Sequence, residues 1–189
     1  MKVRNIPLLT GLSVLLMTVL ACTINVGGPA YPNQHIPVST EAAAELQSAV
    51  QTAVAAGVQS GQVTLVVTEP EITSYLAVQL ETQAQPLFSD PQVTLRNGQI
   101  QIYGTATQGY FQATIQFVVT AGVDPQGQVL IDISTADFGP MPVPAGLKDT
   151  VTAAIQEAYT GAVGPAATGF RLESISVANG SMTIVGRTK

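Results

Sequence analysis

Alternation of apolar and polar residues over positions 91–137 is the feature that most constrains the fold of this chain. Apolar side chains recur at every second position, and turn sequences interrupt them at Asn97-Gly98, near Gln108-Gly109 and at Asp124-Pro125-Gln126-Gly127. A period of two puts the apolar side chains on one face of a strand, and short turns of this kind join antiparallel neighbours. The pattern therefore predicts an antiparallel meander. Its third strand runs for about twelve residues, roughly 40 Å, so the sheet must twist and coil.

Three other segments carry an apolar stripe at helical spacing. The stripes are Leu46, Val50, Val54 and Val58; Ile72, Leu76 and Leu80 with Tyr75 beside them; and Leu147, Val151 and Ile155. Ser39-Thr40-Glu41 is typical of a helix start, and Gly57 and Gly61 are expected to end that helix. The second helix is expected to be capped around Thr68 to Glu71.

A strand formed by Val63, Leu65 and Val67 is expected between the first two helices, and a hairpin across Asn179-Gly180 is expected to close the chain. The fold class we expect is α+β: a long curved antiparallel β-sheet, made of the meander plus the C-terminal hairpin, packed against two or three amphipathic helices.

The N-terminal 22 residues have the composition of an export signal. Lys2 and Arg4 precede an apolar stretch from Ile6 to Leu20, which at about fifteen residues is short for a bilayer span. Val19-Leu20-Ala21-Cys22 resembles the lipobox of bacterial lipoproteins, although Leu20 is bulkier than the usual residue there. The resemblance implies a diacylglycerol on Cys22, cleavage before it, and anchoring at the extracytoplasmic face of the membrane. The simpler interpretation is a free thiol after an ordinary secretory signal.

Residues 22–40 are expected to be the lipidated cysteine and a flexible tether, after a signal peptide over 1–21 and before a single domain over 41–189. The segment from Thr23 to Thr40 contains Gly27-Gly28, Pro29, Pro32 and Pro37 and has no sustained apolar period. A coil of that length would hold the domain roughly 20–25 Å from its anchor.

Charge and residue types exclude several classes of function. The chain has 7 basic and 12 acidic residues, a net charge of −5, which argues against binding nucleic acid or anionic headgroups by charge. The only histidine, His35, lies in the expected tether, and the only cysteine is expected to be acylated. Neither a nucleophile–base pair nor a zinc site can be assembled from them, so we expect no catalysis, no metal and no cofactor.

Carboxylate pairs are the remaining chemistry, and a hydrolase is the least favoured hypothesis. The pairs are Glu69 with Glu71 and Asp132 with Asp137, with Asp124 in a turn. Glu69 and Glu71 stand where a helix N-terminus favours negative charge, which indicates a structural role.

Both faces of the meander admit a functional and a structural interpretation. From Pro91 to Val123 the only charged residue is Arg96, and the polar face carries Gln99, Gln101, Tyr103, Thr105, Gln112, Thr114 and Gln116. This neutral face is either a solvated surface or a contact surface for a glycan, a headgroup layer or another protein. The opposite, apolar face is either plain core or a groove for an acyl chain.

The order of elements over residues 62–189 resembles the YpmS-like family of bacterial membrane-anchored proteins and, more distantly, the LmeA-type phospholipid-binding proteins. The matching features are Val63-Thr64-Leu65-Val66-Val67-Thr68-Glu69 before a helix with Ile72, Tyr75 and Leu76, then the meander, Gly139-Pro140-Met141-Pro142-Val143-Pro144, and the closing hairpin. Thr73 stands where an Asn is expected. The resemblance implies a role in lipid binding or envelope assembly without catalysis.

From these features we expect a non-enzymatic envelope lipoprotein that binds a lipid or other hydrophobic ligand along its curved sheet. The residues expected to line the site are Phe111, Ile115, Phe117, Tyr75 and Leu80. The alternative is a protein- or glycan-interaction module that uses the neutral Gln/Thr face or a sheet edge.

Overall fold

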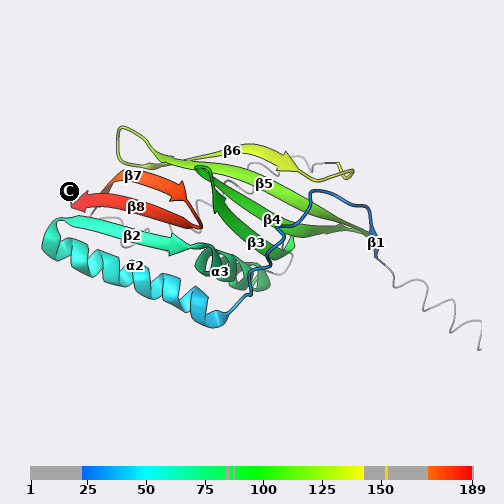
Figure 1. Cartoon of the computed structure of the whole chain (residues 1–189), viewed down its shortest axis with the longest axis horizontal. Helices are drawn as coiled ribbons and strands as arrows, with labels where there is room; N and C mark the ends of the chain where they lie inside the picture. The colour runs from blue at the N-terminus through cyan, green and yellow to red at the C-terminus, as the bar shows by residue number, and fades with distance from the viewer. Residues whose placement is uncertain (1–22, 84–85, 87, 143–151, 153–169, 189) are drawn as a thin grey trace, which may run out of the picture.

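The computed structural model describes residues 23–83, 86, 88–142, 152 and 170–188, which form an α+β fold (Figure 1). The elements are β1 (Ile24–Asn25), α2 (Thr40–Ser60), β2 (Gln62–Thr68), α3 (Glu69–Glu81), β3 (Ser89–Arg96), β4 (Gln99–Gln108), β5 (Phe111–Val123), β6 (Val129–Asp137), β7 (Phe170–Ala178) and β8 (Ser181–Thr188). Apart from residue 152, the third expected helix, over Leu147 to Ile155, and the crossover beyond Pro142 lie outside the described residues.

A five-stranded sheet contains the meander, which is confirmed. Strands β3, β4, β5 and β6 pair antiparallel in sequence order, and β5 is 13 residues long. Its length leaves room for two neighbours on one edge, because β6 pairs with residues 116–123 and β1 pairs in parallel with residues 111–112. Asn97 and Gly98 have φ of 53° and 77°, the left-handed values that a tight two-residue hairpin turn requires.

The C-terminal hairpin belongs to a second sheet, which corrects the expectation of one long sheet. Strands β7 and β8 pair across Asn179-Gly180 as expected, but β8 then pairs with β2, giving a three-stranded sheet in the order β2-β8-β7. Val63, Leu65 and Val67 are buried on β2, opposite Gly186, Ile184 and Met182. The alternation identified these strands, but it carries no information on which partner, far away in sequence, each one takes.

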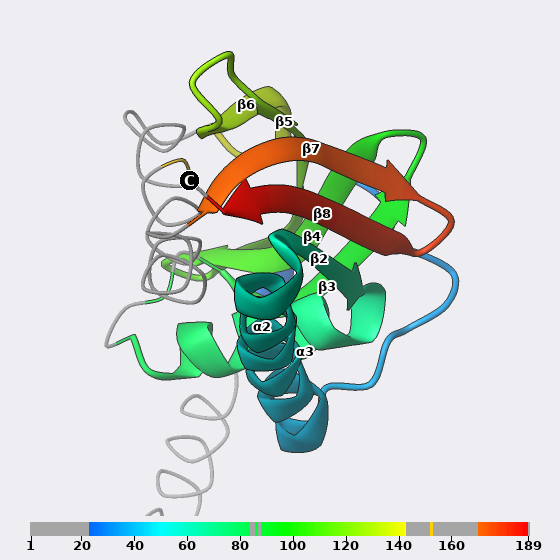
Figure 2. The same cartoon turned by 90° about the vertical axis from the view of Figure 1, so that its left-hand side faces the viewer.

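Helix α2 covers the three-stranded sheet, and Figure 2 shows it beside α3 on one side of that sheet. The Ser39 hydroxyl accepts the Ala42 N–H at 3.0 Å and Gly61 ends the helix at φ 77°. Of the expected stripe, Leu46 and Val50 are buried, Val54 is half-buried and Val58 is 68% exposed.

Gly57 takes the place of Val58 in the contact between helix and sheet. A Cβ at Gly57 would lie 2.9 Å from the Phe170 ring and 3.0 Å from Val63 Cβ. Gly57 therefore lets the last turn of α2 approach the sheet closely and does not end the helix.

Two groups of buried side chains make up the core. The first lies between the five-stranded sheet and α3 and includes Leu80, Phe88, Val93, Leu95, Ile115, Phe117, Val119, Phe138 and Val177. The second lies between α2 and the three-stranded sheet and includes Leu46, Val50, Leu65, Val67, Leu172 and Ile184. Met182 and Ile72 pack against both groups, so the two sheets share one continuous interior.

Helix α3 covers the free edge of β3 with two side chains one helical turn apart. The Glu69 carboxylate accepts the Leu95 N–H at 2.7 Å, and the Thr73 hydroxyl accepts the Val93 N–H at 3.1 Å. Thr73 is fully buried. Edge donors that would otherwise be unpaired are therefore satisfied inside the core.

Each of the two Asn-Gly turns hydrogen-bonds to a strand of the other hairpin. Gly180 N–H donates to the Leu95 carbonyl at 3.0 Å, and Gly98 N–H donates to the Val177 carbonyl at 3.1 Å. Glu69 N–H in turn donates to the Gly180 carbonyl at 3.2 Å. We call this set of contacts, formed by Glu69, Leu95, Gly98, Val177 and Gly180, the joint between the sheets.

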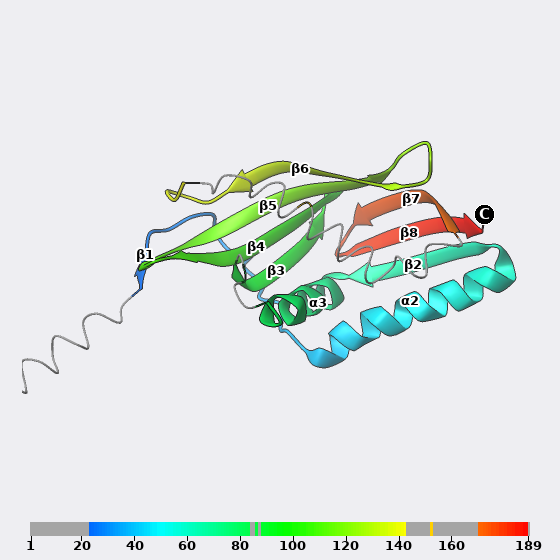
Figure 3. The same ribbon diagram turned by 180° about the vertical axis from the view of Figure 1, so that it is seen from behind.

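Residues 23–39, expected to be a flexible tether, instead form a strap that is bound to the five-stranded sheet. Ile24 and Val26 donate backbone hydrogen bonds to the carbonyls of Tyr110 and Gln112, at 2.7 and 2.9 Å. Further along, the buried Gln92 side chain binds both the N–H and the carbonyl of Ile36. The strap passes in front of β4 and β3 in Figure 1 and behind them in Figure 3. Apart from β1 the strap contains no helix or strand, yet its glycines and prolines do not prevent it from docking.

Gly104 and Gly122 offer a matched pair for testing the packing of the sheet, since both lie inside strands. A Cβ at Gly104 would stand 2.2 Å from Phe88 Cδ2, whereas nothing lies within 4 Å of one at Gly122. We expect Gly104→Ala to lower the free energy of unfolding by about 1–3 kcal/mol, because the Phe88 ring is itself packed on Phe117. Gly122→Ala should leave it unchanged or raise it by about 0.5–1 kcal/mol. Urea denaturation followed by circular dichroism measures both, and equal losses would contradict the close approach.

Candidate functional site

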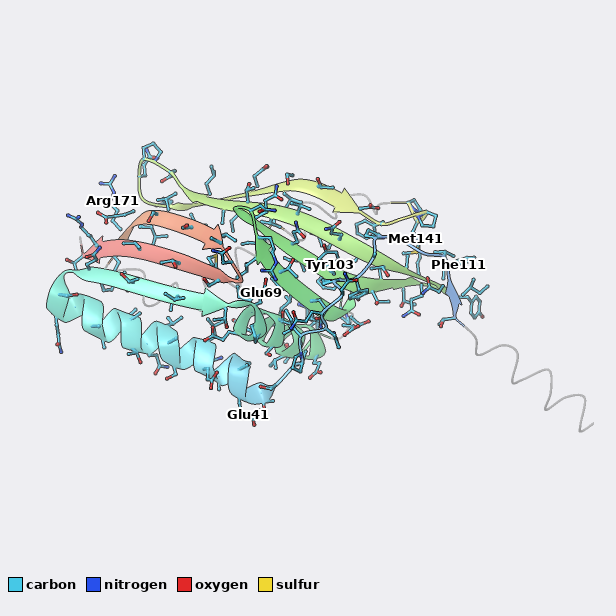
Figure 4. All side chains as sticks on the ribbon, viewed as in Figure 1. Glu41, Glu69, Tyr103, Phe111, Met141 and Arg171 are labelled. Carbon is cyan, nitrogen blue, oxygen red and sulfur yellow. The ribbon has the colours of Figure 1, made fainter. Side chains whose placement is uncertain are left out.

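The residues expected to line a lipid groove do not come together at one surface. Ile115 and Phe117 are each 1% exposed and Leu80 is 7% exposed, all within the first core group. Tyr75 packs against the second core group. Phe111 is 50% exposed at the start of β5, at the extremity of the sheet (Figure 4), and belongs to neither core group. Cys22 lies outside the described residues.

Side chains on the polar face of the five-stranded sheet are linked to one another by hydrogen bonds. Tyr103 is at their centre: its hydroxyl donates to Gln101 Oε1 at 3.0 Å and accepts from Gln116 Nε2 at 2.8 Å. The Thr94 hydroxyl reaches the same Gln101 oxygen at 3.4 Å. Side chains from three adjacent strands therefore form one hydrogen-bonded array. We call Thr94, Gln101, Tyr103 and Gln116 the polar array.

Tyr31 of the strap extends this array toward the start of β5. Its hydroxyl hydrogen-bonds to the Thr105 hydroxyl at 2.9 Å and donates to the Asp90 carbonyl at 3.1 Å. The rings of Tyr31 and Tyr103 are tilted, with centroids 6.2 Å apart. The strap thus covers one end of the polar face and leaves Gln101, Tyr103 and Gln116 of the polar array half-exposed beside it.

Both tyrosines are held in their neutral form. Burial raises the pKa of the Tyr103 hydroxyl above 10.0, and the hydrogen bond with Gln116 offsets part of the rise. Burial also raises the pKa of Tyr31, where the Thr105 hydrogen bond lowers it and the nearby Asp90 charge raises it. At neutral pH the face therefore offers neutral phenols and amides, which bind by hydrogen bonding and ring contact.

Four of the five carboxylates that could have supported hydrolysis form structural hydrogen bonds. Glu69 belongs to the joint and lies 3.5 Å from Arg96, and the Glu71 carboxylate accepts the Thr68 N–H at 2.7 Å. Asp124 accepts the N–H groups of Gln126 and Gln128 within its turn, and Asp137 accepts the Gly139 N–H. Within the described ranges, no three acidic, histidine or cysteine side chains are grouped as metal ligands.

A shallow depression of about 710 Å³ lies at the far end of the sheets, lined by Val123, Asp124, Arg171, Leu172, Glu173, Arg187 and Thr188. Two of its charged side chains form an ion pair, because Arg187 Nε lies 2.7 Å from Glu173 Oε1, and the Arg171 guanidinium donates to the Pro125 carbonyl. The charged groups therefore stabilise the local turn and hairpin.

Tyr31 and Thr94 were missed from the sequence. Tyr31 stands in a segment rich in glycine and proline, and the interpretation of that segment as a tether removed it from consideration. The available signal was the presence of several apolar side chains, Tyr31 and Ile36 among them, in a segment with no charged residue.

Comparison of the sequence with family models gives no match, and comparison with curated proteins gives none. The resemblance to the YpmS-like and LmeA-type proteins therefore stays a prediction. In the part of the chain that the structure describes, no helix combines the length and the apolar character that crossing a membrane requires.

The raised pKa of Tyr103 predicts a loss of stability in alkali. Because the phenol releases its proton more readily in the unfolded chain, its contribution to stability is complete below about pH 10 and is lost as the pH rises through the raised pKa. We expect Tyr103→Phe to reduce the fall in unfolding free energy between about pH 9 and pH 11. At neutral pH the same variant should lose about 1 kcal/mol with its hydrogen bonds. Denaturation at several pH values measures both, and an unchanged slope in alkali would contradict the assignment.

Proposed function

We propose that this protein is a non-enzymatic lipoprotein of the bacterial envelope, anchored by acyl chains on Cys22, which binds a neutral partner through the polar face of its five-stranded sheet. The partner is an envelope protein or a glycan. The observation that carries the proposal is the polar array, in which amides and a phenol are ordered before any partner arrives.

The absence of charge on β4 and β5 supports a binding role for this face. Positions 99 to 123 contain no Lys, Arg, Asp or Glu. Exposed protein surfaces usually carry many charged side chains, which discourage unwanted association. A half-exposed face of Gln, Thr and Tyr loses less on desolvation than a charged one, and its pre-ordered side chains have less conformational entropy to lose on binding.

The anchor is supported by the N-terminal sequence, from the basic start to Ala21-Cys22. We expect Cys22→Ala to move the protein from the membrane to the soluble fraction, because each buried methylene of the acyl chains contributes about 0.8 kcal/mol. Leu20→Ala keeps the cysteine and restores the common small residue, so it should remain in the membrane. Fractionation with mass spectrometry of the N-terminal peptide measures this. An unmodified Cys22 thiol in the mature protein would contradict the anchor.

Adding charge to the polar array should abolish binding at this face. Gln101→Lys and Gln116→Lys each place an ammonium group in the array, and we expect either to weaken partner binding at least about tenfold. Gln47→Lys and Gln51→Lys make the same charge change at exposed positions of α2 and should have no effect. The measurement is photo-crosslinking in the intact envelope from a probe at position 99, followed by protease or glycan-hydrolase digestion to tell the two partner types apart. Equal crosslinking in all four variants would contradict the proposal.

A second candidate function is the binding of a lipid or other hydrophobic ligand inside the curved sheets. It is favoured by a row of half-buried apolar side chains around the first core group: Ile72, Leu76, Ile100, Ile131 and Met182. The same preparations separate the two candidates by organic extraction and mass spectrometry. Stoichiometric phospholipid or isoprenoid, lost in Ile131→Gln but kept in Gln116→Lys, would support the ligand; a lipid-free protein that refuses added lipid would exclude it.

A further inference from the structure

Large exposed apolar side chains gather at one end of the five-stranded sheet. Ile24 is 55% exposed, Tyr110 is 66% exposed and Phe111 is 50% exposed. Figure 4 shows Phe111 at the extremity of the sheet, next to β1. We call these three residues the sheet tip. The remaining large exposed apolar residues of the described chain, Val38, Val58, Val66 and Leu130, are single positions on separate elements.

Backbone hydrogen bonds hold the sheet tip in place. Ile24 N–H donates to the Tyr110 carbonyl at 2.7 Å, and Ile24 is the parallel partner of Phe111. Phe111 begins β5, which is paired on both sides. The three side chains therefore stand on hydrogen-bonded backbone, Ile24 on β1, Tyr110 in the turn before β5 and Phe111 on β5. Clustered exposed apolar residues on such a support indicate a contact surface.

The sheet tip has no formal charge in its neighbourhood along the chain. Neither residues 23–40 nor residues 99–123 contain Lys, Arg, Asp or Glu, although the whole chain carries −5. The other end of β5 lies beside Arg171, Glu173 and Arg187. The sheet tip, with an exposed Phe, Tyr and Ile and no charged residue near it along the chain, can enter a headgroup layer, and aromatic side chains favour that layer.

The distance from the anchor to the sheet tip is fixed by the chain itself. Only Thr23 separates Cys22 from β1, and two residues span at most about 7 Å when fully extended. Because β1 runs parallel to β5, its N-terminal end lies at the same end of the sheet as Phe111. Acyl chains attached to Cys22 would therefore bring the sheet tip to the membrane surface.

We propose that the sheet tip inserts into the headgroup region of the bilayer that holds the acyl chains on Cys22, and so orients the domain. This inference rests on the lipid anchor proposed above. The acyl chains hold the domain at the bilayer, and the sheet tip sets its orientation. A lipid chain and a second membrane contact bind more stably together than either does alone. Strand β5 then leads away from the bilayer, and the polar array is held above the surface with its face open to the side.

The experiment uses the absence of tryptophan from the chain. Tyr110→Trp and Phe111→Trp each place one fluorophore at the tip, and Leu130→Trp places one at an exposed apolar position on β6 near the far end of β5. The full chain, expressed with its own N-terminal segment, is reconstituted into phosphatidylcholine vesicles with and without brominated lipid. For tryptophan buried about 5–10 Å into the headgroup boundary, we expect brominated lipid to quench fluorescence at positions 110 and 111 by at least about twofold and to spare position 130.

Flotation of the vesicles separates failure of the tip from failure of the anchor. If the protein floats with the vesicles but tryptophan at both tip positions is unquenched, the anchor proposal stands and the tip proposal is overturned. The same holds if the emission shifts to the blue without quenching, which would show that the tip contacts protein. A chain that does not float overturns the anchor, and the tip is then tested by coupling Cys22, the single cysteine, to a maleimide lipid in the same vesicles. Quenching at all three positions would also overturn the proposal, because it would show an unoriented domain.

Discussion

The rest of the structure depends on the hydrogen bonds that other elements make to the backbone of β3 at its free edge. Leu95 is fully buried, and its N–H and carbonyl are both bound by groups from other elements, the Glu69 carboxylate and the Gly180 N–H. An unpaired buried backbone group costs about 1–3 kcal/mol, so this edge can be buried only if α3 and the C-terminal hairpin are both in place. The same contacts fix the angle between the two sheets. Because both hairpins turn through Asn-Gly with positive φ at each residue, their turns are tight enough to reach each other's strands.

Local patterns of the sequence predicted the elements well, and long-range pairing was beyond them. Alternation and turn residues identified β2 to β8, and the Ser39 and Thr68 caps located both described helices. The pairing of Gln62 with Arg187, across almost the whole domain, has no local signal, so the split into two sheets was missed. The position of Gly57 is similar, since helical spacing favours Val58 but the close approach of the sheet favours a residue without a side chain.

The sequence predicted which residues form the polar face of the sheet, but not which parts of either face remain accessible. Alternation correctly separated a polar from an apolar face, and it named Gln101, Tyr103 and Gln116 as members of the polar one. It could not tell which part of the apolar face stays open, because Ile115 and Phe111 have the same parity and differ only in what covers them. The strap was the largest omission. Its contacts through Tyr31 and Ile36 are irregular in spacing, and composition alone indicated a coil.

The strap has a mechanical consequence. Strand β1 is parallel to β5, so a pull on the chain ahead of Ile24, directed outward along the sheet, slides one strand past the other. In that geometry the bonds from Ile24 to Tyr110 and from Val26 to Gln112, and the bond from Thr114 N–H to the Gly27 carbonyl, are loaded together and not one after another. Gln92 holds the strap again at Ile36, deeper in the domain. A pulling force between a membrane anchor and a bound partner would thus act first on the hydrogen bonds between the strap and β5. These bonds would have to break together, in shear, before the force reached the core.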